Sequence, residues 1–345
     1  WWAHHSKGFA FRSACGSSLV PRSRVRSAPI FRRDLLLHRC PPVRPFLVDS
    51  TDAKLRNMAH FAGRVAIVTG AGRGLGRAMA KGLAEAGAQV ALVELDKDVL
   101  NEAVAEIGGD TVGIAADVSK PAEGLSIVEE TRKVFGGIHI LVNNAGLGPQ
   151  RFRDTDRSNA KMIWEIDFSD WHIFLDVNTP GNFEMTLAVM PLMLEQGWGR
   201  IVNVTTSLDT MTNYTNGAYG PSKAGAEALA TMIAGGVEGT GVTCNVLIPG
   251  GPADTRMISA SGVYANRDLL IQPDVMNPPL LHLVSEEGGA VNNRRFRAAL
   301  WDPANDAAVN MEASGDPIAW PQLGGQAIRP KGDPRGNRNT GRENG

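Results

Sequence analysis

Residues 64–76 read RVAIVTGAGRGLG, and this stretch decides the fold of the chain. Its apolar run, Val65–Val68, suits a strand that is buried on both faces. Gly70, Gly74 and Gly76 then let the backbone turn tightly and approach a pyrophosphate at the start of a helix. Beyond them the apolar residues follow a helical period. The stretch therefore predicts a strand, a glycine bend and a helix that together bind a dinucleotide.

A second apolar run, Val90–Val93, ends in Glu94. A carboxylate at this place accepts hydrogen bonds from the ribose hydroxyls of NAD and repels the extra phosphate of NADP. Arg73, inside the bend, is either a group that attracts that phosphate or a solvated arginine. We expect NAD as the cofactor, with NADP as the alternative.

Further motifs follow the bend in a fixed order. The bend has the spacing T-G-x-x-x-G-x-G, and after it come Asp117-Val118, Asn143-Asn144-Ala145-Gly146, Asn178, a Y-x-x-x-K pair at Tyr219 and Lys223, and Pro249-Gly250. In this order, residues from roughly 58 to 310 resemble the short-chain dehydrogenase/reductase family. The resemblance implies an NAD(P)-dependent oxidoreductase that interconverts a secondary alcohol and a ketone by hydride transfer.

The resemblance also assigns contacts with the cofactor. It places Asp117 and Val118 against adenine, although Asp117 can instead simply end its strand. It places the N-N-A-G turn beside the cofactor ribose. The expected cofactor-binding residues are Gly70, Arg73, Gly74, Leu75, Gly76, Glu94, Asp117, Val118, Asn144, Ala145, Gly146, Tyr219, Lys223, Pro249, Gly250 and Thr255.

Tyr219 and Lys223 are four residues apart in an expected helix, so both project from one face. A nearby ammonium and an oxidised nicotinamide both favour the phenolate form of tyrosine. Tyr219 is therefore the expected general acid/base, which gives a proton to a carbonyl or takes one from an alcohol. By resemblance, Lys223 also holds the nicotinamide ribose.

Two further polar residues complete the expected catalytic group. The family has a serine about thirteen residues before the tyrosine, and here that position is Thr206, with Ser207 beside it. We favour Thr206 by spacing because a shift of one residue at a strand end reverses the side chain. A hydroxyl that merely caps its own backbone is the alternative. Asn178 matches the family asparagine that holds a water near the lysine, or else it makes a structural polar contact.

Alternating strand and helix patterns predict a Rossmann-like, doubly wound parallel sheet of about seven strands with helices on both faces. Pro191 should lie inside the long helix near 170–196. The expected strands lie near 64–70, 89–94, 111–115, 138–143, 199–205, 242–248 and 294–299. The other expected helices lie near 74–87, 97–107, 121–135, 218–239 and 273–285.

Composition limits the function classes. The chain has 345 residues with 43% hydrophobic and 21% charged, enough for one large core. Residues 1–57 carry 11 Lys and Arg against 3 Asp and Glu, so the rest of the chain is acidic, and we expect no nucleic-acid partner. No apolar run is long enough to predict a membrane span, and the spacing of the three cysteines predicts neither a metal site nor a disulfide framework.

The chain divides into three expected parts. Residues 58–328 form a single oxidoreductase domain, residues 1–57 are a disordered or non-native extension, and residues 329–345 are a disordered tail. The basic composition of residues 1–57 leaves an organelle transit peptide as the alternative. We expect a cytoplasmic protein.

Two segments should enclose the substrate. One is Leu147–Asp170, with Phe152, Trp164 and Phe168; the other is Gly251–Asn277. In the latter, Tyr264, Met257 and Met276 either line an apolar pocket or belong to the core. The resemblance implies a homodimer or homotetramer built on the long helix and the Tyr219 helix.

Two other functions stay open. A catalytically quiet dinucleotide-binding or interaction protein is favoured by the threonine in place of serine. A sugar-nucleotide epimerase or dehydratase uses a similar tyrosine and lysine, but the glycine spacing and the lack of a separate substrate domain count against it.

Overall fold

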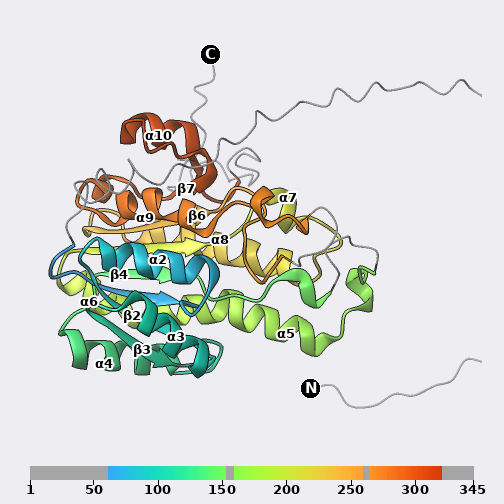
Figure 1. Ribbon diagram of the computed structural model, residues 1–345, viewed down its shortest axis with the longest axis horizontal. Helices are drawn as coiled ribbons and strands as arrows, with labels where there is room; N and C mark the ends of the chain where they lie inside the picture. Colours follow the sequence, from blue (N-terminus) through green and yellow to red (C-terminus); the bar gives the residue numbers. More distant parts are fainter. Residues whose placement is uncertain (1–60, 153–158, 259–263, 321–345) are drawn as a thin grey trace, which may run out of the picture. The chain divides into compact units, whose positions relative to one another are not determined.

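A computed structural model describes residues 61–152, 159–258 and 264–320. These residues form an eight-stranded sheet in the order β3-β2-β1-β4-β5-β6-β7-β8 (Figure 1). The strands are β1 Val65–Thr69, β2 Gln89–Glu94, β3 Thr111–Ala115, β4 Ile140–Asn143, β5 Gly199–Val204, β6 Val242–Ile248, β7 Arg294–Arg297 and β8 Gly315–Pro317. β1 to β7 pair in parallel, as the sequence predicts, and β8 is an additional strand antiparallel to β7.

Helices cover both faces of this sheet. On one face pack α2 (Gly74–Glu85), α3 (Lys97–Ile107) and α9 (Asn277–Val284). On the other pack α4 (Glu123–Phe135), α6 (Asn182–Glu195) and α8 (Tyr219–Gly236). The doubly wound, Rossmann-like arrangement is therefore confirmed.

Smaller elements join these layers. They are α5 Phe168–Asp176, α7 Leu208–Met211, α10 Ala307–Ser314 and the short turns η1 Pro149–Arg151, η2 Ile163–Glu165, η3 Val177–Gly181, η5 Arg267–Leu269, η6 Pro273–Met276, η7 Glu287–Ala290 and η8 Ala298–Leu300. The expected extension 1–57 and tail 329–345 lie outside the described residues.

The central strands β1, β4, β5 and β6 are buried along their whole length because both faces of the sheet are covered. In β1, Ala66 and Val68 point into one core, while Ile67 between them points into the other. The chain winds from β1 to β3 in one direction and then crosses to β4 on the other side of β1. Ligands of such sheets bind where this direction reverses, at the carboxyl ends of the strands. A ligand is therefore expected at the carboxyl ends of β1 and β4.

The expected single helix near 170–196 is the clearest difference from the sequence prediction. It consists of α5, a π-helical turn (η3) and α6. Pro180 lies inside the π-helical turn and cannot donate a backbone hydrogen bond, so the regular ladder is interrupted there. Pro191 does lie inside α6, as expected.

No helix in the described ranges combines the length and the apolar character that crossing a bilayer demands.

Candidate active site

The bend between β1 and α2 depends on its glycines. Gly70 and Gly74 have φ of +63° and +56°, in the left-handed region that strains other residues. A Cβ on Gly76 would lie 2.1 Å from the Gly70 carbonyl oxygen, so a larger residue does not fit. Within the described residues, Arg73 makes no capping hydrogen bond to α2, whose first turn holds no acidic residue. The positive end of α2 therefore fits the pyrophosphate of a dinucleotide.

The N-N-A-G turn after β4 is fastened directly to this bend. The Thr69 hydroxyl oxygen accepts the N–H groups of Asn144 and Ala145, both at 3.0 Å. In return, Asn144 Nδ2 donates to the carbonyl oxygens of Thr69 (2.9 Å) and Gly70 (3.1 Å). The side chain of Asn144 thus holds the bend and the turn together at the reversal point of the sheet.

Glu94, at the end of β2, also reaches the bend. Its carboxylate accepts the Gly72 N–H at 3.2 Å and the Leu95 N–H at 3.0 Å. Arg73 pairs with Asp96 at 3.1 Å. Glu94 therefore places a carboxylate at the bend, and the guanidinium of Arg73 already pairs with the carboxylate of Asp96.

The two expected adenine contacts, Asp117 and Val118, lie after β3. The Asp117 carboxylate accepts the backbone N–H of Ser119 at 3.0 Å and its hydroxyl at 2.7 Å, so it shapes the turn at the strand end. Val118 is buried.

The segment after β6 returns to the bend as well. A Cβ on Gly74 would lie 3.0 Å from Thr255 Cγ2, which places Thr255 against the start of α2. Pro249 accepts the Ala299 N–H at 3.0 Å through its carbonyl oxygen, and Gly250 has a φ of +98°. The expected cofactor-binding residues from β1, β4 and β6 are thus brought to one edge of the sheet.

Tyr219 begins α8, and Lys223 lies one turn later. The Thr206 hydroxyl, just after β5, lies beside the Tyr219 phenol, close enough to lower its pKa. Lys223 Nζ donates to the Val204 carbonyl oxygen at 2.9 Å. A Cβ on Gly146 would lie 3.1 Å from the same Nζ, so the lysine lies next to the N-N-A-G turn. Tyrosine, lysine and threonine therefore meet just after the end of β5.

Ser207, the alternative hydroxyl, has another partner. Its Oγ accepts the Thr210 N–H at 3.3 Å and caps α7. Thr206 is thus the hydroxyl that the fold turns toward Tyr219.

Burial sets the protonation of both catalytic candidates. It raises the pKa of Tyr219 to about 12, and the hydrogen bond from Thr206 offsets part of this rise. It lowers the pKa of Lys223 to about 8. The protein by itself therefore keeps the phenol protonated at neutral pH, and desolvation outweighs any lowering of its pKa by the neighbouring ammonium.

Asn178 lies in the π-helical turn and is fully buried. Its Oδ1 accepts the Leu147 N–H at 2.8 Å, and its Nδ2 donates to the Leu147 carbonyl oxygen at 3.1 Å and to Ser222 Oγ at 2.9 Å. A Cβ on Gly146 would lie 3.0 Å from the same Oδ1. Asn178 therefore joins the N-N-A-G turn to α8 beside Lys223.

An apolar cluster adjoins Tyr219. Phe152, from the first expected wall, is buried there with Phe174 of α5, and Met257 from the second wall packs against them. Residues from both expected walls, Phe152 and Met257, therefore lie beside Tyr219. Sequence reasoning did not single out Phe174, although its spacing of three from Trp171 in a helical segment is a signal for a shared face.

Other expected wall residues lie elsewhere. Trp164 and Phe168 are 80% and 74% exposed. Met276 is fully buried in the core beneath α2 and α9. It is therefore a core residue and does not line a pocket.

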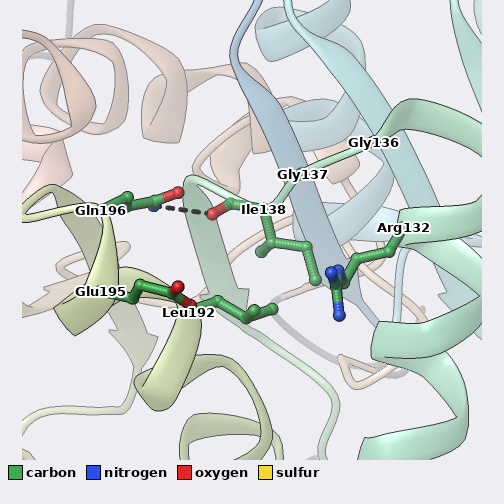
Figure 2. A pocket seen from close by; sticks show the side chains of 7 residues that line it. All are labelled: Arg132, Gly136, Gly137, Ile138, Leu192, Glu195 and Gln196. Atoms are coloured by element: carbon green, nitrogen blue, oxygen red, sulfur yellow. Dashed lines mark hydrogen bonds between the residues drawn. The ribbon is translucent and has the colours of Figure 1, made fainter.

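A shallow recess lies at the opposite end of β4 from this site. It is lined by the ends of α4 and α6, and Gln196 donates to the Ile138 carbonyl oxygen at 2.9 Å across it (Figure 2). None of the expected catalytic residues borders it.

Comparisons with known proteins agree with this geometry. The sequence profile of the family described as short chain dehydrogenase matches residues 64–262. A short-chain type dehydrogenase/reductase from Picea abies is 33% identical, over 69% of this chain and 91% of its own length. The peroxisomal multifunctional enzyme type 2 of Drosophila melanogaster is also 33% identical over 69% of this chain, but the match spans only 39% of that longer protein.

A solved structure shows the same likeness. It is the crystal structure of a protein assigned as a short-chain alcohol dehydrogenase from Sinorhizobium meliloti, with a TM-score of 0.60 and 27% identity. The similarity covers 69% of this chain and 95% of that one. The family profile covers more than half of the chain, and the Picea relative is matched over nearly its whole length. The chain therefore belongs to the short-chain dehydrogenase family of oxidoreductases.

Proposed function

We propose that this protein is an NAD(P)-dependent oxidoreductase that interconverts a secondary alcohol and a ketone, with Tyr219 as general acid/base. One observation carries the proposal: the Thr206 hydroxyl, just after β5, lies beside the Tyr219 phenol. They lie beside a lysine that touches the N-N-A-G turn. Two hydroxyls placed this way can hold and protonate one carbonyl oxygen.

The bend and its neighbours would hold the cofactor. The start of α2 would bind its pyrophosphate, and Glu94 would accept the ribose hydroxyls in place of the Gly72 N–H. Arg73 already pairs with Asp96 and is therefore less available to attract the extra phosphate of NADP, which supports NAD as the cofactor. When bound, the nicotinamide supplies or takes up the hydride.

The remaining chemistry belongs to the chain's own residues. At neutral pH the Tyr219 phenol holds its proton and can donate it to a carbonyl oxygen, while Thr206 donates a second hydrogen bond. In the reverse direction Tyr219 must become a phenolate, and the Lys223 ammonium nearby favours that form. Phe152, Phe174 and Met257 beside Tyr219 support a small substrate with an apolar part.

Assembly and location belong to the same proposal. We infer a homodimer or homotetramer in the cytoplasm, without a nucleic-acid, membrane or metal partner. The relatives' names include a peroxisomal protein, so the cellular location is to be tested by imaging the full chain.

The deciding experiment compares native protein with Tyr219→Phe on a panel of ketones and alcohols. The loss of the phenolic proton should lower turnover by a factor of about 10² to 10⁴, with NADH binding unchanged. Tyr214→Phe is the matched control, because Tyr214 is 72% exposed and only five residues away in the chain. Intact turnover in Tyr219→Phe would refute the proton-transfer role. Tighter binding of NADH than of NADPH would support the choice of NAD.

The rival function is a catalytically quiet dinucleotide-binding protein. The threonine at position 206 favours it, because the extra methyl takes up room where a substrate oxygen would lie. Native protein that binds NADH but turns over no member of the panel would support this rival.

A further inference from the structure

α8 carries a third ionisable residue on the face that holds Tyr219 and Lys223. Glu227 follows Lys223 by four residues, as Lys223 follows Tyr219, so the three side chains share one face of the helix. Glu227 is fully buried. An acidic residue in such a place is paired or hydrogen-bonded, and its partners indicate its role.

Those partners come from the segment just after β5 and from β7. One carboxylate oxygen of Glu227 accepts the Thr205 hydroxyl at 2.9 Å. The other lies 3.4 Å from Nε of Arg295, in an ion pair whose side chains are 0% and 13% exposed. Arg295 comes from β7, where it is the register partner of Val246 in β6.

Arg295 also reaches the residue that faces Tyr219. Its Nη2 donates to the Thr206 carbonyl oxygen at 2.8 Å. The Glu227–Arg295 pair therefore bridges from the catalytic helix, through β7, to the backbone of Thr206.

Together these contacts fix three consecutive residues. Lys223 holds the Val204 carbonyl, Glu227 holds the Thr205 hydroxyl, and Arg295 holds the Thr206 carbonyl. Threonine has a stiff χ1 angle, so a fixed backbone also fixes the direction of the Thr206 hydroxyl. A buried ion pair adds little net stability over apolar residues of the same volume. Its presence here fits a task other than stability.

We propose that Glu227 and Arg295 are positioning residues, which hold the chain after β5 so that the Thr206 hydroxyl faces the Tyr219 phenol. The catalytic consequence rests on the proposed function, whereas the placement of Thr206 does not. The test therefore needs one readout without turnover and one with it.

Two variants remove the bridge in different ways. Glu227→Gln with Arg295→Met deletes both charges together, so no buried charge is left unpaired. Arg295→Lys keeps the positive charge, but a single ammonium lacks the fork that contacts Glu227 and Thr206 at once. Arg297→Met is the matched control, since Arg297 lies in the same strand and pairs with Asp316 instead.

The first readout is the NMR chemical shift of the Tyr219 ring carbon that bears the hydroxyl. The chain has three tyrosines, so Tyr219→Phe assigns this resonance by its loss. Both bridge variants should move the resonance in the direction that Thr206→Val moves it, and Arg297→Met should leave it in place. A native-like resonance in a folded bridge variant would overturn the proposal.

The second readout is steady-state kinetics with NADH and a ketone that native protein reduces. The bridge variants should lower kcat about 10-fold to 100-fold, as expected for a misplaced catalytic contact, with the KM for NADH unchanged. In a Thr206→Val background the same changes should cause no further loss of kcat; additive losses would contradict action through Thr206. If native protein reduces no ketone, the proposed function fails, while the Tyr219 resonance still tests the positioning.

Discussion

Lys223 holds an ammonium group where water hardly reaches, with 4% of the residue exposed. Burial lowers its pKa to about 8, from an ordinary value of 10.5. Its charge therefore titrates in mildly alkaline solution, where the charge next to Tyr219 is lost. The lysine that favours the phenolate is thus itself sensitive to pH.

The free energy of unfolding should change with pH because of this titration. Between pH 8 and 10.5 the unfolded chain keeps the Lys223 proton and the folded chain does not, so the contribution of this group to stability rises with pH in that window. Across this pH window, the free energy of unfolding of native protein should rise by about 3 kcal/mol relative to that of Lys223→Met. Urea unfolding at a series of pH values measures it.

Lys133→Met, at an exposed position on α4, is the control and should show no such trend. If the difference in the free energy of unfolding between native protein and Lys223→Met did not change with pH, Lys223 would keep its ordinary pKa. That Tyr219 and Lys223 lie one turn apart on a helix could be predicted from their spacing in the sequence. The pKa values could not, because burial depends on what the rest of the chain packs around the helix.

At the scale of elements, the join between α5 and α6 matters most for the site. The π-helical turn carries Asn178, whose amide satisfies both backbone groups of Leu147 and bonds Ser222 of α8. One side chain thus links the turn after β4, the α5–α6 joint and α8.

Asn178→Ala should weaken the fold as well as the site. It leaves the part-buried backbone groups of Leu147 and the buried hydroxyl of Ser222 without this partner, so the free energy of unfolding should fall by about 2–4 kcal/mol. Chemical denaturation measures the change. Asn101→Ala, on the exposed face of α3, should stay within about 0.5 kcal/mol of native protein. An equally small change in Asn178→Ala would refute the linking role.

Most of the parallel strands were predictable because they are short apolar runs bounded by turn residues, whereas β7 (Arg294–Arg297) holds a single apolar residue. The π-helical turn was not, since no period marks it and its residue Asn178 contacts Leu147, which is 31 residues away in the chain. β8 was not predictable either, because three residues, one of them a proline, carry no period. Met276 shows a third limit: apolar character alone does not separate a pocket residue from a core residue.

At the scale of the whole molecule, apolar side chains remain exposed on the helices that the family resemblance places between subunits. Leu187 and Leu194 of α6 are 55% and 44% exposed, and Met232 of α8 is 70% exposed. Such side chains are compatible with contact between copies of the chain.

Light scattering should therefore find a dimer or tetramer. Leu187→Glu combined with Met232→Glu should shift the equilibrium from the oligomer toward the monomer, because a buried unpaired carboxylate opposes association. Leu125→Glu is the control, since Leu125 is 57% exposed on α4, outside the expected contact. A native protein that is monomeric at all concentrations would contradict the assembly.

The last strand has a consequence for solubility. β8 closes the border of the sheet next to β7 with only three residues, and its exposed part is Asp316 and Pro317. Proline offers no N–H and aspartate adds charge, so this border is a poor template for a strand from another molecule. Deleting residues 315–317 would uncover the flank of β7, and the shortened protein should form aggregates more readily.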